Sequence, residues 1–78
     1  MGWVYDEKKL YTKAIFCFDK AIELDPEFAY AWNNKGVALY YLGKYWKARR
    51  CAKKVLEIDP DYENAKRLKQ ACNEKLWW

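Results

Sequence analysis

Apolar residues recur along this chain at the spacing of an α-helix. Positions three and four residues apart lie on one face of a helix, so such a pattern predicts a helix with one buried side. Two such helices are predicted, and each is expected to end at an Asp-Pro pair, Asp25-Pro26 or Asp59-Pro60, because proline lacks the backbone N–H and restricts the residue before it. The two apolar sets are Ala14, Ile15, Phe18, Ala21 and Ile22, and then Ala48, Ala52, Val55 and Leu56.

The same reasoning predicts five helical segments and an all-α fold. We expect the segments at about residues 2–9, 12–24, 27–42, 45–58 and 62–76. Their connections are only a few residues long, and such short loops force neighbouring helices to run antiparallel and to pack in pairs. The predicted architecture is an antiparallel stack of helix-turn-helix units.

Two of the turns differ in how strongly the sequence specifies them. Gly43 can adopt the left-handed conformation that connects the third segment to the fourth. Lys9 stands at the equivalent place between the first two segments, where that conformation costs roughly 1–2 kcal/mol. The turn at Lys9–Tyr11 either forms or straightens, and straightening would join two segments into one helix. A straightened helix would favour exchange of a helix between two chains.

An internal repeat of 34 residues relates the two apolar patterns. When the sequence is shifted by 34 residues, eight of the eighteen pairs between residues 11 and 28 are identical, and Cys17 falls on Cys51. Gly2 aligns with Gly36 under the same shift. A period of 34 residues is typical of a solenoid built from helix-turn-helix units.

The residues at fixed places in this repeat resemble those of the tetratricopeptide repeat family. The family has a leucine, a tyrosine and a large aromatic residue where this chain has Lys35, Leu39 and Ala52. The resemblance implies a superhelical, non-catalytic module that binds other proteins. The matching pattern in the central unit consists of Trp32, Lys35, Gly36, Leu39, Ala48, Ala52 and Pro60.

The resemblance also divides the chain into units. We interpret residues 1–26 as a truncated first repeat, 27–60 as a complete second repeat and 61–78 as a capping helix that ends in Trp77 and Trp78. About three repeats are needed for a stable continuous core. The prediction that follows is self-association as a homodimer that covers the incomplete first repeat; a fragment of a longer protein is the alternative.

Family members bind peptides in a concave groove lined by the first helix of each unit. Asparagine side chains can donate to and accept from a peptide backbone, and tyrosines offer flat amphipathic surfaces. The alternative is a polar surface that binds nothing. The groove predicted here is lined by Tyr30, Asn33, Asn34, Val37, Tyr40, Tyr41, Asn64 and Arg67.

Four of the five tryptophans match no core position of the family. Trp32 is expected in the core, whereas Trp3, Trp46, Trp77 and Trp78 form a predicted self-association surface. Burying a large apolar side chain stabilises by roughly 1.5–3 kcal/mol, so their exposure on a small monomer would forgo a large gain. A terminal Trp pair that folds back on its own cap helix, or that has no fixed structure, is the alternative.

Positive charge is concentrated in the second half of the chain. Residues 1–34 carry a net charge of −2 and residues 35–78 carry +6, for a total of +4. A solvated helix exterior is the simplest interpretation, ahead of an acidic protein partner and then nucleic acid. The predicted basic patch consists of Lys44, Lys47, Arg49, Arg50, Lys53 and Lys54.

The composition argues against several other functions. There is no histidine, which removes the usual general base near neutral pH and the imidazole metal ligand. The three cysteines, Cys17, Cys51 and Cys72, are an odd number without metal-ligand spacing, so we expect small, partly buried reduced thiols. No apolar run is long enough to span a bilayer. We therefore expect a cytoplasmic protein without catalytic residues, metal or cofactor.

Overall fold

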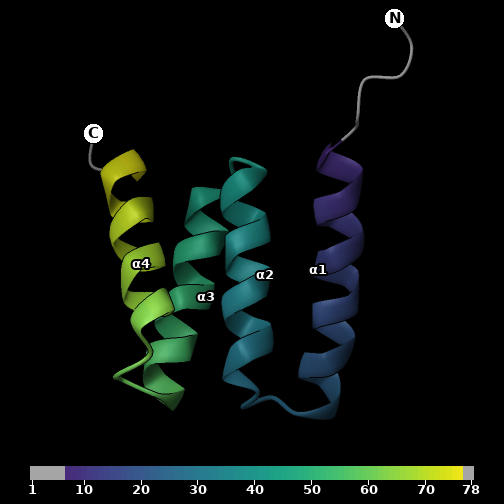
Figure 1. The fold of residues 1–78 in the computed structure, drawn as a ribbon, viewed down its shortest axis with the longest axis horizontal. Coiled ribbons are helices and arrows are strands. Elements are labelled where there is room, and N and C mark those ends of the chain that lie inside the picture. Colours follow the sequence, from purple (N-terminus) through teal and green to yellow (C-terminus); the bar gives the residue numbers. More distant parts are fainter. Residues whose placement is uncertain (1–6, 77–78) are drawn as a thin grey trace, which may run out of the picture.

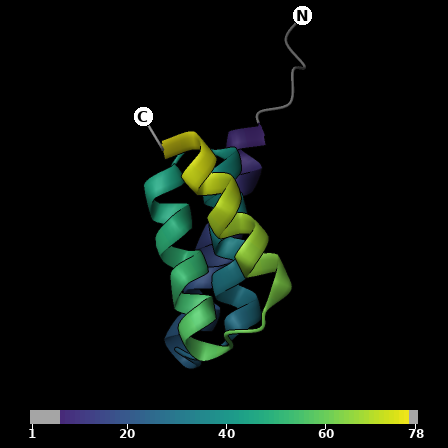
Figure 2. The same ribbon diagram turned by 90° about the vertical axis from the view of Figure 1, so that its left-hand side faces the viewer.

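The computed structural model describes residues 7–76, which form four antiparallel helices. These are α1 (Glu7–Leu24), α2 (Ala29–Tyr41), α3 (Tyr45–Ile58) and α4 (Glu63–Leu76). They stand in a row in the order α1, α2, α3, α4 (Figure 1). Figure 2 shows α4 tilted relative to α3 at the end of this row, where it contacts both α3 and α2. The prediction of an all-α helical solenoid is confirmed for this part of the chain.

The first two predicted segments are one helix in the structure. Of the two outcomes expected at Lys9–Tyr11, the structure has the straightened one: α1 runs without a break from Glu7 to Leu24, so the separation between the predicted segments 2–9 and 12–24 is absent. The Thr12 hydroxyl donates a hydrogen bond of 2.8 Å to the carbonyl of Lys8, which is the partner four residues back in a continuous helix. Residues 2–6 of the first predicted segment lie outside the described residues.

The two Asp-Pro pairs end α1 and α3 in the same way. The Oδ1 atoms of Asp25 and Asp59 each accept a hydrogen bond of 3.1 Å from the backbone N–H two residues later, at Glu27 and Asp61. This side-chain contact forms a turn that competes with the helix. The two units of the sequence repeat therefore have the same hydrogen-bonded turn, after α1 and after α3.

Gly43 ends α2 in the left-handed conformation that the sequence predicts. Its φ angle is 81°, and the N–H of Lys44 donates to the carbonyl of Leu39 at 2.9 Å. The N–H of Gly43 donates to the carbonyl of Tyr40, also at 2.9 Å. These two bonds form the Schellman motif, which satisfies the last carbonyls of the helix and turns the chain into α3.

The core of the described residues lies between α2, α3 and α4. Small residues on α3 allow close packing, and a β-carbon added to Gly36 of α2 would lie 3.0 Å from Cys51 Cβ. Trp32 is only partly buried; it packs against this core, and its Nε1 donates to the carbonyl of Pro26 at 2.8 Å. No helix within residues 7–76 has the length and apolar character needed to cross a membrane. The central cluster of buried residues consists of Leu39, Ala48, Cys51, Ala52, Leu68 and Cys72.

Candidate functional site

A groove between α2 and α4 contains most of the residues predicted to bind a peptide. It encloses about 350 Å³. Tyr30 is the exception among the predicted residues, because it lies outside the groove, 58% exposed, with its ring 5.9 Å from that of Phe28. Leu68 and Ala71 of α4 also line the groove, although the sequence pattern did not predict them as groove residues. The structure brings together Asn33, Asn34, Val37, Tyr40, Tyr41, Asn64 and Arg67.

Asn33 is the polar residue of the groove with an unmet hydrogen-bonding requirement. Its side chain is only 4% exposed, and its Oδ1 accepts no hydrogen bond from any described residue. Buried side-chain oxygens are nearly always hydrogen-bonded in folded proteins, since an unpaired one costs roughly 1–3 kcal/mol. Asn33 Oδ1 is therefore a buried acceptor at the wall of the groove that lacks a donor.

A row of tyrosines fixes one end of this groove. The rings of Tyr11 and Tyr41 stack at 5.5 Å, and Tyr40 meets both Tyr41 at 5.7 Å and Tyr45 at 5.2 Å, edge to face. Such ring pairs contribute roughly 0.5–1.5 kcal/mol each beyond the area they bury. The contacts join α1, α2 and α3, so Tyr40 and Tyr41 are held in place before any ligand arrives.

Helix α1 carries an apolar stripe on the face that its neighbours leave open. Among the described helices, α1 packs against α2, whereas α3 packs against both α2 and α4. Leu10 is 60% exposed, Leu24 is 88% exposed, and Cys17 between them is exposed as well. We call this face the α1 stripe; it consists of Leu10, Ala14, Cys17, Ala21 and Leu24.

The repeat shows what this face looks like when it is covered. Three members of the α1 stripe, Ala14, Cys17 and Ala21, align with residues of α3 that are at most 4% exposed. All three α3 residues are buried, and Ala48 and Cys51 belong to the core cluster, while the α1 residues are exposed or only partly buried. The α3 residues concerned are Ala48, Cys51 and Val55.

The three cysteines differ in chemistry as well as in position. Burial raises the pKa of the Cys51 thiol to about 11, against an opposing effect of nearby Lys35, and burial also raises the pKa of Cys72. The prediction of small buried thiols is thus correct for these two and wrong for Cys17, which is exposed. Since the thiolate is the reactive form, the raised pKa values make Cys51 and Cys72 less reactive. Cys17 is the thiol that a reagent in solution can reach.

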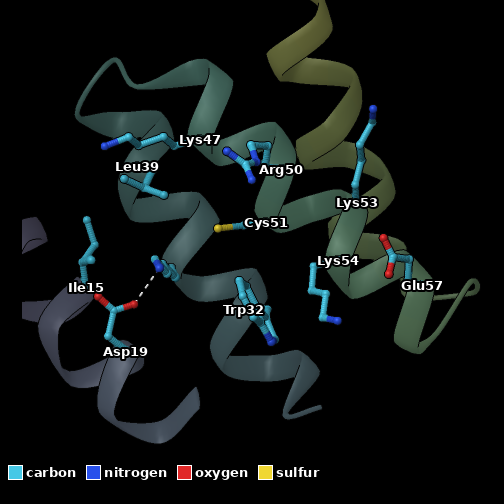
Figure 3. A pocket seen from close by; sticks show the side chains of 11 residues that line it. Ile15, Asp19, Trp32, Leu39, Lys47, Arg50, Cys51, Lys53, Lys54 and Glu57 are labelled. Atoms are coloured by element: carbon cyan, nitrogen blue, oxygen red, sulfur yellow. Dashed lines mark ion pairs between the residues drawn. The ribbon is translucent and has the colours of Figure 1, made fainter. Parts of the chain in front are cut away.

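The basic patch predicted from the linear sequence divides between different surfaces. Arg49 lies 4.7 Å from the ring of Trp46 and donates to Asn73 Oδ1 of α4 at 2.9 Å. Lys44 precedes α3, is exposed, and lines neither the groove nor the second hollow described next. The other four residues, Lys47, Arg50, Lys53 and Lys54, line a second hollow of about 810 Å³ (Figure 3).

Of the four tryptophans predicted to mediate self-association, the structure describes Trp46. Trp46 is 64% exposed on α3, beside Arg49. Trp3, Trp77 and Trp78 lie outside the described residues. Their part in self-association stays a prediction. Within residues 7–76, no three residues of the metal-ligating types come together as a possible metal site.

Comparison with known proteins agrees with the repeat and with the helical stack. Residues 2–43 match the family described as TPR repeat, and residues 29–62 match the family described as Tetratricopeptide repeat. The chain belongs to the tetratricopeptide repeat family, whose members are generally non-catalytic modules for protein–protein interaction.

A similar protein comes from Methanocaldococcus jannaschii and is named Uncharacterized protein MJ0572. It is 54% identical to this chain over 37 residues, which are 47% of this chain and 43% of that protein. The match therefore covers less than half of either protein.

Proposed function

We propose that this chain is a protein-interaction module that pairs with a second copy of itself through the α1 stripe. The observation that supports this proposal is the difference in burial between equivalent residues of α1 and α3. Cys51 is 4% exposed under α2, whereas Cys17 at the same repeat position is exposed. A helix of a second copy would occupy, against α1, the place that α2 occupies against α3.

The unbroken α1 favours exchange between chains over closure within one chain. In the second repeat, Gly36 lies against Cys51 and Ala48. By the 34-residue repeat, Cys17 and Ala14 of α1 correspond to Cys51 and Ala48, so the α1 stripe matches the surface that α2 covers in the second repeat. The helix contains no turn between Glu7 and Tyr11 that returns the chain onto its own stripe. The N-terminal segment of a second copy can supply this cover, and the exchange is reciprocal in a two-fold dimer.

Replacing Cys17 by arginine tests this self-association. Because an unpaired charge would be buried in the dimer, we expect the dissociation constant to rise by about a hundredfold or more. Sedimentation velocity at micromolar concentration should give twice the chain mass of 9.4 kDa for the original sequence and the chain mass for the variant. In the original sequence, the reaction of Cys17 with a thiol reagent should also slow as the protein concentration rises.

Phe16→Arg is the matched control for that experiment. Phe16 is exposed beside Cys17 but is not part of the α1 stripe, and arginine is the residue at the equivalent position of the second repeat, Arg50. This variant should remain dimeric. A single-chain mass for the original sequence, or equal dissociation by both variants, would contradict the proposal.

A second candidate function is peptide binding in the groove, which the unpaired Oδ1 of Asn33 favours. We expect a donor group of a bound peptide, such as a backbone N–H, to satisfy this atom between Tyr40 and Asn64, which line the same groove. This function would be compatible with the dimer, since no member of the α1 stripe lines the groove.

Asn33→Leu removes the acceptor and keeps the side chain bulky. For peptides selected from a displayed library on the original protein, we expect about tenfold weaker binding by fluorescence titration. The free energy of unfolding should stay equal or rise, because the variant removes an unpaired buried oxygen. Tyr30→Ala, outside the groove, should bind the same peptides unchanged. Failure to select any peptide, or the same affinity for both variants, would rule out this function.

A further inference from the structure

A second hollow lies on the opposite side of α2 from the peptide groove. Its residues on α2 are Trp32, Lys35 and Leu39, which fall about half a helical turn away from the groove residues Asn33 and Tyr40. Residues of α1 and α3 complete the lining (Figure 3). We call this region, of about 810 Å³, the basic hollow. None of the residues that line it lines the groove.

The charges of the basic hollow are unbalanced. Lys35 is paired with Asp19 of α1, with the two charged atoms 2.6 Å apart. Within residues 7–76, no carboxylate forms an ion pair with any of the four basic residues that α3 contributes. Glu57 is the one other acidic residue of the lining. The unpaired cations are Lys47, Arg50, Lys53 and Lys54.

The floor of the basic hollow is apolar. Ile15 and Trp32 are partly buried there, and Leu39 and Cys51 form its base. Lys35 holds its ammonium group 5.6 Å from the centre of the Trp32 ring, which keeps one cation at this floor. A ligand for this hollow therefore needs both negative charge and an apolar side chain.

The basic residues are spaced to face successive turns of another helix. Lys47, Arg50 and Lys54 lie at positions i, i+3 and i+7 of α3, which puts them on one face over about 10 Å. An acidic helix with carboxylates at the same intervals would meet all three. This repeat of charges distinguishes the surface from basic residues scattered around a helix.

We propose that the basic hollow binds an acidic helical segment of a partner protein. Its carboxylates would pair with Lys47, Arg50 and Lys54, and one apolar side chain would contact Trp32 and Leu39. A nucleic acid fits less well, because a single strand would need exposed aromatic residues in the hollow on which to stack its bases. The exposed aromatic residue of α3, Trp46, does not line the hollow and so cannot stack a base there.

The test uses a labelled synthetic helical peptide of about eleven residues, or three turns. The peptide has glutamates at i, i+3 and i+7 and leucine on the same face. By fluorescence anisotropy, Lys47→Gln, Arg50→Gln and Lys54→Gln together should weaken binding about tenfold, because the variant removes three ion pairs that are each weak near the protein surface. Binding should also weaken as salt is added.

The matched control makes the same change in charge outside the hollow. Lys8→Gln, Lys44→Gln and Lys66→Gln affect exposed residues that do not line it, and together should leave the affinity within about twofold at equal salt. An equal loss in both triple variants would overturn the proposal, as would equal binding of a scrambled peptide. Tighter binding of a single-stranded oligonucleotide of the same charge would overturn it in favour of nucleic acid.

Discussion

Replacing Gly36 by valine is expected to lower the free energy of unfolding by about 3 kcal/mol. Gly36 lies where α2, α3 and α4 meet. A β-carbon there would lie 2.7 Å from Leu68 Cδ2, 3.0 Å from Cys51 Cβ and 3.3 Å from the carbonyl oxygen of Ala48. Leu68 can rotate away, but the two α3 atoms move only with the helix. Valine therefore has to separate α2 from α3.

Thermal unfolding followed by circular dichroism measures this effect. In a domain of this size, each kcal/mol corresponds to a change in Tm of roughly 4–8 °C. Gly43→Ala is the control, since nothing lies within 4 Å of the added carbon and its cost of about 1–2 kcal/mol comes from the positive φ angle. If Gly36→Val destabilised no more than Gly43→Ala, the close approach of the three helices would be wrong.

Local signals explain why most of the fold is predictable from the sequence. Asp25-Pro26 and Asp59-Pro60 end helices by interactions within a few residues, and Gly43 forms its turn through its own backbone conformation. The apolar spacing then decides which side of each helix is buried. These features need no knowledge of distant residues, and the structure has α3 at Tyr45–Ile58, as the pattern predicts.

The course of α1 could not be decided from the sequence alone. Lys9 weakly opposes a left-handed turn, and residues 7–11 can also continue a helix, so the two outcomes differ by little in local energy. The choice depends on what packs against Cys17 and the rest of the α1 stripe. That partner is remote in the chain or belongs to another chain, and periodicity carries no information about it.

The two hollows illustrate the same limit. Most of the groove could be predicted because five of its residues lie on α2 and follow the pattern of the family. The basic hollow could not, because it combines Asp19 of α1 with Lys35 of α2 and Arg50 of α3. The run of basic residues is evident in the sequence, but the side of the helix on which each one lies is not used by that pattern. Successive residues are rotated by about 100° around a helix, so Arg49 contacts α4 whereas Arg50 lines the basic hollow.

Replacing Leu39 by alanine should have the other large effect on stability, a loss of about 2–5 kcal/mol. Leu39 is 5% exposed and packs in the core with Ala48 and Leu68. The substitution removes three carbon atoms from a place where the neighbouring helices can close only in part. Urea unfolding should show a lower midpoint, and the loss should be the same at every protein concentration at which the chain is monomeric.

Leu24→Ala is the matched variant, and it separates packing within a chain from packing between chains. Leu24 is 88% exposed, so at concentrations below dissociation its loss should change the free energy of unfolding by no more than about 0.5 kcal/mol. At higher concentration it should weaken the dimer, because Leu24 belongs to the α1 stripe. If Leu24→Ala destabilised the dilute monomer as much as Leu39→Ala does, Leu24 would be covered by its own chain. The stripe would then not be free for a second copy.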